Sequence, residues 1–230
     1  MSQNTNQIGQ IVIDEAHCIS QWGHSFRPAY KEIPNFINNI SEQWPVILAL
    51  TATLNPKDQE EICSDFQIAK NNIFKSEYLL RQNIKLQYEE LANEKAKRKH
   101  LEEILDAHEN EKIIVYVHRK SGEYGTKAMS ENFQAKGLSC DFFDADREDE
   151  EKKKVLANFE TGNICVIFAT NAFGMGIDIN DIRVIIHYLL PESIEQYYQE
   201  IGRCGRDGKT SYAYLLYSPE IGRASCRERV

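Results

Sequence analysis

Short apolar runs alternate with longer amphipathic segments along most of this chain. Runs rich in β-branched and aromatic residues predict strands over 10–14, 46–51, 83–90, 112–117, 140–143, 164–168, 183–188 and 211–217. Apolar residues at helical spacing between these runs predict helices over 55–66, 93–108, 121–136, 147–160 and 193–202. Strands that alternate with helices are typical of a parallel sheet covered on both faces, so we expect an α/β fold.

Prolines give more detail in the first third of the chain. Asn55 precedes Pro56, which predicts an N-cap followed by proline at the first helical position. Apolar residues also recur at helical spacing over 30–40, and we expect Pro34 to break or bend that helix. A short extended piece is expected near 72–75.

Composition narrows the class of protein. The 230 residues are 42% hydrophobic, enough for one large domain or two modest ones. A net charge of −8 argues against a generally basic nucleic-acid binder, so any such contact needs a local patch or stacking. No apolar run approaches 18 residues and no signal peptide is evident, so we expect a cytoplasmic protein without a membrane partner.

The cysteines form no C-x-x-C pair and are spread through predicted strands and motifs. This distribution favours reduced thiols over disulfides, and we expect no zinc site. The six positions are Cys18, Cys63, Cys140, Cys165, Cys204 and Cys226.

Two adjacent carboxylates, Asp14 and Glu15, follow the apolar run 11–13. Ligands bind at the carboxyl ends of strands in α/β sheets. One acid can hold Mg²⁺ through water, and the other can orient or deprotonate the water that attacks a γ-phosphate. The alternative is a buried strand that simply ends in an acid.

An unusual loop follows these acids, with Trp22, His24, Phe26 and Arg27 among glycine and proline. Aromatic rings mixed with a cation suit stacking on unpaired nucleic-acid bases. The alternative is that Trp22 and Phe26 are ordinary core residues.

The whole string IVIDEAHCISQWGHSFRPAY (11–30) resembles the DEAH box and aromatic-rich loop of RecQ-type DNA helicases, in superfamily 2. The resemblance runs from about residue 8 to about 218, and it implies ATP and Mg²⁺ as cofactors and single-stranded or forked DNA as partner. Further segments resemble later motifs of the family, in order: LALTATL (48–54), LLRQNI (79–84), KIIVYVHRK (112–120), VIFATNAFGMGIDINDIRVIIHY (166–188) and QYYQEIGRCGRDG (196–208).

The resemblance implies two RecA-like lobes with parallel sheets. Residues 1–78 look like the C-terminal part of the first lobe, 79–218 like a second lobe, and 219–230 are an off-pattern tail. The first lobe is expected to be incomplete, because no G-x-x-x-x-G-K-[ST] loop precedes Asp14. The GKT ending at Thr210 follows a predicted helix and has the wrong spacing, so it does not replace that loop. We therefore expect this chain alone to be inactive.

In register with the family, Asp14 would hold Mg²⁺ and Glu15 would position water. Thr51 and Thr53, at the end of the second predicted strand, resemble a hydroxyl relay that links these acids to DNA movement. The alternative is that they are ordinary threonines at a strand end. Seven residues are implied in sensing DNA or in coupling: His17, Trp22, His24, Phe26, Arg27, Thr51 and Thr53.

Arg203 and Arg206 lie three apart at the end of a predicted helix, so they are expected to share a face and to point into one cleft. An arginine supplied across a cleft can stabilise charge on a transferring phosphoryl group. By resemblance Arg206 is the better candidate for this finger, with Arg203 and Gln199 nearby. The alternative is a solvated basic helix end.

The segment ATNAFGMGIDI (169–179) surrounds Met175 with small residues after a buried strand. Such a loop can approach a ligand closely. Gly176 would then line the ligand site, and Asp178 would face the ligand. The resemblance implies that this segment couples the ATP state to the grip on DNA. The alternative is a tight turn around a core methionine.

Two segments depart from the family pattern. Residues 144–147, DADR, stand where relatives usually carry a motif like HAGL, and seven acids within 141–151 would repel phosphate. The alternative is that Asp146 caps the helix over 147–160, with the following acids favouring its N-terminal dipole. YVHRK (116–120) also stands where relatives often show a cysteine and then Ser-Arg.

Together these features predict a fragment of an ATP-dependent 3′–5′ DNA helicase that couples hydrolysis to movement on single-stranded DNA and to strand separation. The alternative is a non-catalytic DNA-binding or adaptor protein that kept the helicase fold. A phosphate-binding loop encoded just upstream would favour the enzyme.

Overall fold

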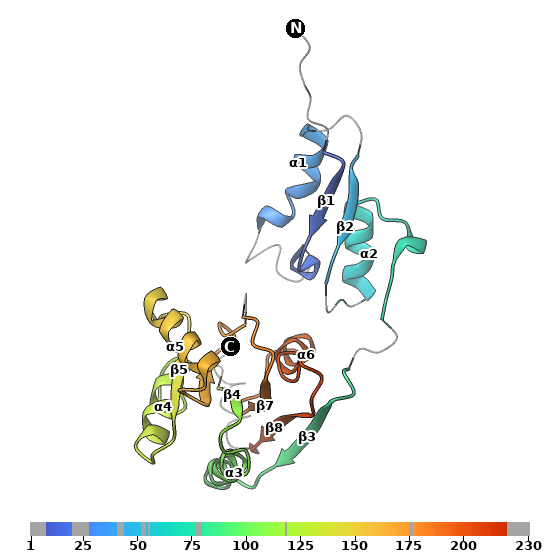
Figure 1. Ribbon diagram of the computed structural model, residues 1–230. Coiled ribbons are helices and arrows are strands. Elements are labelled where there is room, and N and C mark those ends of the chain that lie inside the picture. Colours follow the sequence, from blue (N-terminus) through green and yellow to red (C-terminus); the bar gives the residue numbers. More distant parts are fainter. Residues whose placement is uncertain are drawn as a thin grey trace. The chain divides into compact units, whose positions relative to one another are not determined.

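The computed structural model divides the chain into two compact units, Met1–Glu77 and Tyr78–Val230 (Figure 1). Each unit is described by itself. The structure describes residues 8–19, 28–40, 44–51, 54, 56–76, 80–117, 119–174 and 177–219. No helix within these ranges is both long enough and apolar enough to cross a membrane.

The first unit is built around a two-stranded parallel sheet, with one core beneath it. Its elements are β1 (Gln10–Ile13), α1 (Ile33–Ile40), β2 (Val46–Ala49) and α2 (Pro56–Asp65), with short 3-10 turns at Ala16–Ile19, Pro28–Tyr30 and Lys70–Asn72. Ile13, Ile37 and Ile62 bring one face of the sheet together with both helices. The opposite face is exposed at Val12, Val46 and Leu48. Among the described residues, the two helices therefore cover one face of this sheet.

Pro34 begins a helix and does not break one. It is the second residue of α1, and the backbone N–H of Phe36 already donates to the carbonyl of Glu32 at 2.9 Å. The first N–H groups of a helix have no partner within the helix, so a proline there removes no hydrogen bond. Pro56 is likewise the first residue of α2, as predicted. Near the expected extended piece at 72–75, Lys70–Asn72 form a 3-10 turn and Ile73 has extended backbone, but the segment joins no sheet among the described residues.

The second unit contains a six-stranded sheet in the order β3-β8-β7-β4-β6-β5, with every neighbouring pair parallel. The strands are β3 (Ile84–Glu90), β4 (Lys112–Tyr116), β5 (Cys140–Phe143), β6 (Val166–Ala169), β7 (Ile182–His187) and β8 (Ser211–Tyr217). The first and last strands of the unit are paired, with Ile84 opposite Ser211.

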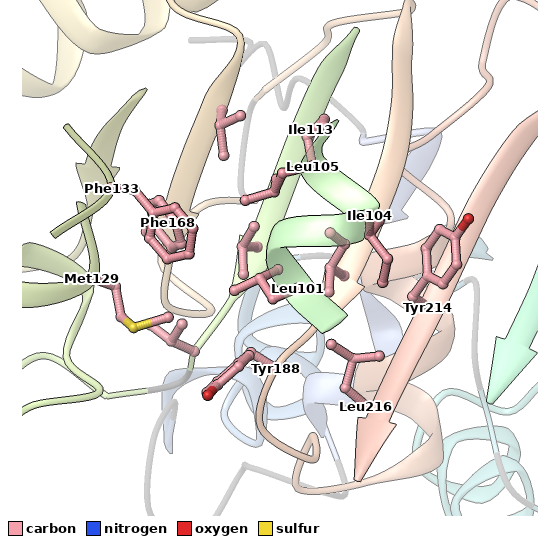
Figure 2. Packing of buried hydrophobic residues seen from close by; sticks show 14 of the residues in the cluster. Leu101, Ile104, Leu105, Ile113, Met129, Phe133, Phe168, Tyr188, Tyr214 and Leu216 are labelled. Atoms are coloured by element: carbon pink, nitrogen blue, oxygen red, sulfur yellow. The ribbon is translucent and has the colours of Figure 1, made fainter. Parts of the chain in front are cut away.

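Helices cover both faces of this larger sheet, as predicted. α3 (Glu94–Ala107) and α4 (Thr126–Gln134) pack on one face, and Figure 2 shows Leu101 and Leu105 of α3 directed at the strands. On the other face Phe159 of α5 (Asp149–Thr161) packs with Ile114 and Ile185. Such burial of apolar side chains on both faces explains the nearly continuous apolar runs of the central strands.

α4 begins later than the sequence pattern suggested. The helix was predicted from residue 121, but residues 121–125 form turns that close at Gly125. A Cβ on Gly125 would lie 2.7 Å from the carbonyl oxygen of Lys120, so the chain needs glycine at this close approach.

Candidate active site

Asp14 and Glu15 stand exposed just beyond the carboxyl end of β1. Glu15 has a φ of 50°, in the left-handed region that few non-glycine residues adopt. The turn is held by a bond from the Ala16 N–H to the Leu50 carbonyl at 2.9 Å, which ties it to the segment after β2. Strain of this kind costs on the order of 1–3 kcal/mol and is concentrated at functional sites. Here it leaves both carboxylates outside the sheet.

His17 lies between the acid pair and the end of β2. Its Nδ1 is 3.2 Å from Oε2 of Glu15 and 3.1 Å from Oγ1 of Thr51. With a proton on Nδ1 the ring donates to the carboxylate, and without it the ring accepts from the hydroxyl. The presence or absence of a proton on Nδ1 therefore decides whether the ring binds Glu15 or Thr51. In this way His17 links the segment after β1 to the segment after β2.

The donors in this unit fit a hard cation. The exposed carboxylates of Asp14 and Glu15 offer the oxygen ligands that Mg²⁺ prefers. Among the described residues no group of three or more His, Cys, Asp or Glu side chains converges on one point. Mg²⁺ is usually held by one or two carboxylates with water and substrate phosphates, so it needs no such cage.

In the second unit, α6 (Ile194–Ile201) ends before both candidate arginines. Arg203 and Arg206 lie in the turns that follow the helix, so the expectation that they share a helix face is wrong. Both arginines instead contact the loop between β6 and β7. Nη1 of Arg203 donates to the Gly174 carbonyl at 2.6 Å, and Nη1 of Arg206 contacts Oδ1 of Asp178 at 2.8 Å.

Gly174 allows this close contact, because a Cβ there would overlap the Arg203 guanidinium and that side chain would have to shift. Nε of Arg203 is buried and has no hydrogen-bond partner among the described residues. The hydroxyl of Tyr116 donates to the Phe173 carbonyl at 3.0 Å, and burial raises the pKa of that hydroxyl. Arg203 therefore rests against the loop after β6 with one donor still unused.

Asp178 faces solvent, as expected for a loop that could meet a ligand, but it is also paired with Arg206. Gln199 is half-buried on α6, four residues before Arg203. Arg203 and Arg206 thus both contact the loop that contains Asp178. Gln199 lies on α6, the helix that precedes the two arginines.

Several residues that hold this region were not predicted from the sequence. Arg183 on β7 pairs with Asp207 at 2.6 Å, and this hydrogen bond lowers the pKa of the Asp207 carboxyl. Arg81 and Asn83 donate to backbone carbonyls of the turn that carries the arginines. The only signal for Arg81 and Asn83 was their place in LLRQNI, a matched segment to which no role was assigned.

A buried pair fixes α6 against the sheet. Nε2 of His187 lies 2.8 Å from Oε2 of Glu200, and both side chains are almost fully buried. Gln196 donates to the other oxygen of Glu200 at 3.0 Å, and the His187 ring stacks on Tyr116. Hydrogen bonds between groups as well buried as these are costly to break, so they fix the start of the turn 202–209 that carries Arg203 and Arg206, here called the arginine turn.

The divergent segment 141–151 is organised by Asp144 and not by Asp146. Asp144 is buried and accepts from the Thr126 hydroxyl at 2.7 Å and from the backbone N–H groups of Asp146 and Arg147. Asp146 is exposed and pairs with Lys120. The predicted Asp146 cap is therefore wrong.

The acids of this segment still interact favourably with the dipole of α5. α5 begins at Asp149, and its first turn carries Asp149, Glu150 and Glu151, as expected for a positive helix end. Arg147 pairs with Asp141 at 2.7 Å, so part of the acidic charge is compensated locally.

Some expected site residues lie outside the described residues, and their assignments stay predictions. They are Trp22, His24, Phe26, Arg27, Thr53 and Gly176.

Two family models match the chain. A DEAD/DEAH box helicase model matches residues 1–62, and a helicase conserved C-terminal domain model matches residues 96–208. The RecQ-like DNA helicase BLM of Xenopus laevis is 41% identical over 215 residues, covering 92% of this chain and 15% of that protein. The ATP-dependent DNA helicase RecQ of Bacillus subtilis is 36% identical over 211 residues, covering 91% of this chain and 34% of that protein. The chain thus spans about a third or less of these two relatives.

Solved structures share the fold. The Saccharomyces cerevisiae protein Dbp5, solved bound to RNA and ADP BeF3, superimposes with a TM-score of 0.71 at 19% identity, covering 95% of this chain and 56% of that one. A DEAD box protein from Methanococcus jannaschii gives 0.59 at 23% identity, with the same coverage of 95% and 56%. The likeness supports a RecA-like α/β architecture for this chain, with an incomplete N-terminal sheet.

Proposed function

The chain belongs to the RecQ-type helicases of superfamily 2, a family of ATP-dependent enzymes, and from this membership we propose the activity of the whole protein. The whole protein hydrolyses ATP to move 3′ to 5′ on single-stranded DNA and separates strands at forks. The observation that carries the proposal is the exposed Asp14–Glu15 pair, connected through His17 to Thr51.

The first unit supplies the acids of the ATP site. Asp14 would hold Mg²⁺, which when bound neutralises charge on the phosphates. Glu15 orients the attacking water and accepts its proton, a role that suits an exposed carboxylate within reach of a second hydrogen-bonding group. His17 transmits the charge of Glu15 to Thr51, because its Nδ1 is within hydrogen-bond distance of both.

The second unit supplies cations. Arg206 is partly exposed and its partner Asp178 is largely exposed, so phosphate oxygens can replace that carboxylate at little cost. Arg203 keeps a buried N–H without a partner among the described residues, which is costly unless a ligand satisfies it. Both features support a role for the arginines at the phosphates.

DNA contact is assigned to the aromatic-rich loop. The loop begins a few residues after Glu15, so its position is expected to follow the state of the ATP site. Trp22 and Phe26 would stack on bases, and His24 and Arg27 would add polar contacts. A cytoplasmic location is part of the same proposal.

The test uses the full-length protein with duplexes that carry a single-stranded tail at either the 3′ or the 5′ end. Wild type is expected to unwind the 3′-tailed duplex with ATP, and Glu15→Gln is expected to bind ATP but to hydrolyse and unwind almost nothing. Glu32→Gln, an exposed acid of the same unit, serves as the control. Unwinding by Glu15→Gln, or activity on 5′ tails alone, would contradict the proposal. DNA binding by wild type without any ATP hydrolysis would favour an adaptor.

A further inference from the structure

We infer that Arg81 is a positioning residue that sets the backbone on which Arg203 and Arg206 are carried. Nη2 of Arg81 donates to the carbonyls of Gly202 at 2.6 Å and Cys204 at 2.7 Å. Nη1 donates to the Gly205 carbonyl at 3.0 Å. The catalytic meaning of this arrangement rests on the proposed function.

The chemistry explains why arginine stands at this position. The turn after α6 leaves carbonyls without helical partners, at the negative end of the helix dipole. A planar guanidinium presents several donors in a fixed geometry and can satisfy three such acceptors together. A lysine ammonium at the same place is a single point charge on a flexible stem and cannot reproduce that fork.

Asn83 holds the same turn a little further along. Its Nδ2 donates to the carbonyls of Gly205 and Lys209, each at 2.8 Å. Gly205 has a φ of 61°, and a Cβ there would lie 2.6 Å from Nδ2 of Asn83. The turn is therefore fitted closely against the segment 81–83, which lies near the start of the second unit.

The carbonyls that Arg81 binds belong to residues next to Arg203 and Arg206 in the sequence. Arg203 lies between two of the three acceptor residues, and Arg206 follows the third directly. Misplacement of a reacting or stabilising group by about 1 Å can cost about a hundredfold in rate. Arg81 contacts the backbone of the turn, so its loss should move the arginines without removing either guanidinium.

The first experiment measures the shape of the turn without using activity. Cys204 and Cys140 are both buried, and burial raises the pKa of each thiol to about 11, so both should react slowly with an aromatic disulfide reagent. Arg81→Gln in the 230-residue chain is expected to speed labelling of Cys204 about tenfold or more, by local opening, and to leave Cys140 on β5 unchanged. Arg147→Lys is the control, since Arg147 also donates to a backbone carbonyl of this unit, that of Phe142, in addition to its pairing with Asp141.

The second experiment measures ATP hydrolysis by the full-length protein. Arg81→Gln and Arg81→Lys are expected to lower kcat about tenfold or more, with KM for ATP and the melting temperature near wild type. Arg147→Lys should keep both constants.

The outcomes separate the two proposals. Unchanged kcat in the Arg81 variants of an active wild type overturns the inference, whether or not Cys204 is labelled faster. So does equal acceleration at Cys204 and Cys140 with a lowered melting temperature, which indicates general destabilisation. If wild type hydrolyses no ATP, the proposed function fails, and unchanged Cys204 labelling would independently overturn the positioning of the turn.

Discussion

At the scale of single residues, the arginines of the second unit divide into two kinds. Arg81 and Arg183 bind the backbone or a neighbouring acid of the turn, and the structure fixes their side chains. Arg206 instead pairs with Asp178, whose side chain is 78% exposed. Ion pairs in such surroundings contribute about 0–1 kcal/mol, so Arg206 can change partner easily. Arg206 is therefore suited to exchanging Asp178 for a ligand. Arg81 and Arg183 are suited to holding the turn in place.

The replacement Arg206→Ala tests this division in the full-length protein. A finger acts mainly on charge that develops in the transition state, so kcat should fall by about 10³–10⁵ with KM for ATP nearly unchanged. DNA-stimulated ATPase rates and binding of a non-hydrolysable nucleotide provide the measurement. Lys209→Ala, a neighbouring exposed cation, is the control. Loss of affinity with normal turnover of bound ATP would instead make Arg206 a ground-state ligand.

At the scale of elements, strands were easier to predict than helix ends. The buried strands of the second unit read as apolar runs because helices cover both faces, and their predicted ranges agree with the structure to within about two residues. α4 starts five residues late because the chain turns closely at Gly125, and α5 starts two residues late because Asp144 organises the preceding turn while it is held by Thr126, 18 residues away. Helical periodicity carries no information about such contacts.

The candidate site shows the same limit. Asp14 and Glu15 were identified because they follow a predicted strand, at whose carboxyl end ligands bind, and the two arginines because GRCGRDG resembles a family motif. The contact of Arg203 with Gly174 could not be read from spacing, since it joins two loops by tertiary packing. The supporting contacts of Arg81 were missed for that reason as well.

The arginine turn gives a prediction at this scale through its two left-handed glycines. Gly205→Ala meets both a φ of 61° and close atoms of Asn83 and Ser211, whereas Gly208→Ala has a φ of 82° but open space. The left-handed conformation costs about 1–2 kcal/mol for an ordinary residue, and overpacking adds about 1–3 kcal/mol. Gly205→Ala should therefore lower the free energy of unfolding by more than Gly208→Ala.

Urea unfolding of the 230-residue chain, followed by circular dichroism, measures the difference between these glycine variants. Equal destabilisation would show that the turn relaxes freely, and it would weaken the case for a tightly fitted arginine turn.

At the scale of the whole molecule, the two units differ in completeness. Among the described residues, the second has a six-stranded sheet with two covered faces, whereas the first has two strands and leaves Val12, Val46 and Leu48 exposed on one face. The sequence before Asp14 also contains no phosphate-cradling loop. The 230-residue chain thus carries Asp14, Glu15, Arg203 and Arg206 but not the loop that would bind the phosphates of a nucleotide.

For this reason the purified 230-residue chain is expected to bind ATP weakly and to show no steady hydrolysis, with or without single-stranded DNA. Phosphate release under conditions in which a full-length relative is active provides the measurement. Hydrolysis that DNA stimulates and that Glu15→Gln abolishes would show that the missing loop is dispensable.

The pairing of β3 with β8 has a consequence for how the protein is made. β3 is the first strand of the second unit to leave the ribosome, whereas its partner β8 is the last of the strands described in that unit, with Ile84 opposite Ser211. Contacts between residues so distant in sequence form late and slowly. The carbonyls that Arg81 binds lie shortly before β8 and emerge after the other described strands of this unit. The nascent chain therefore holds β3 without its partner until β8 has emerged, and the turn that carries Arg203 and Arg206 takes shape only when β8 docks.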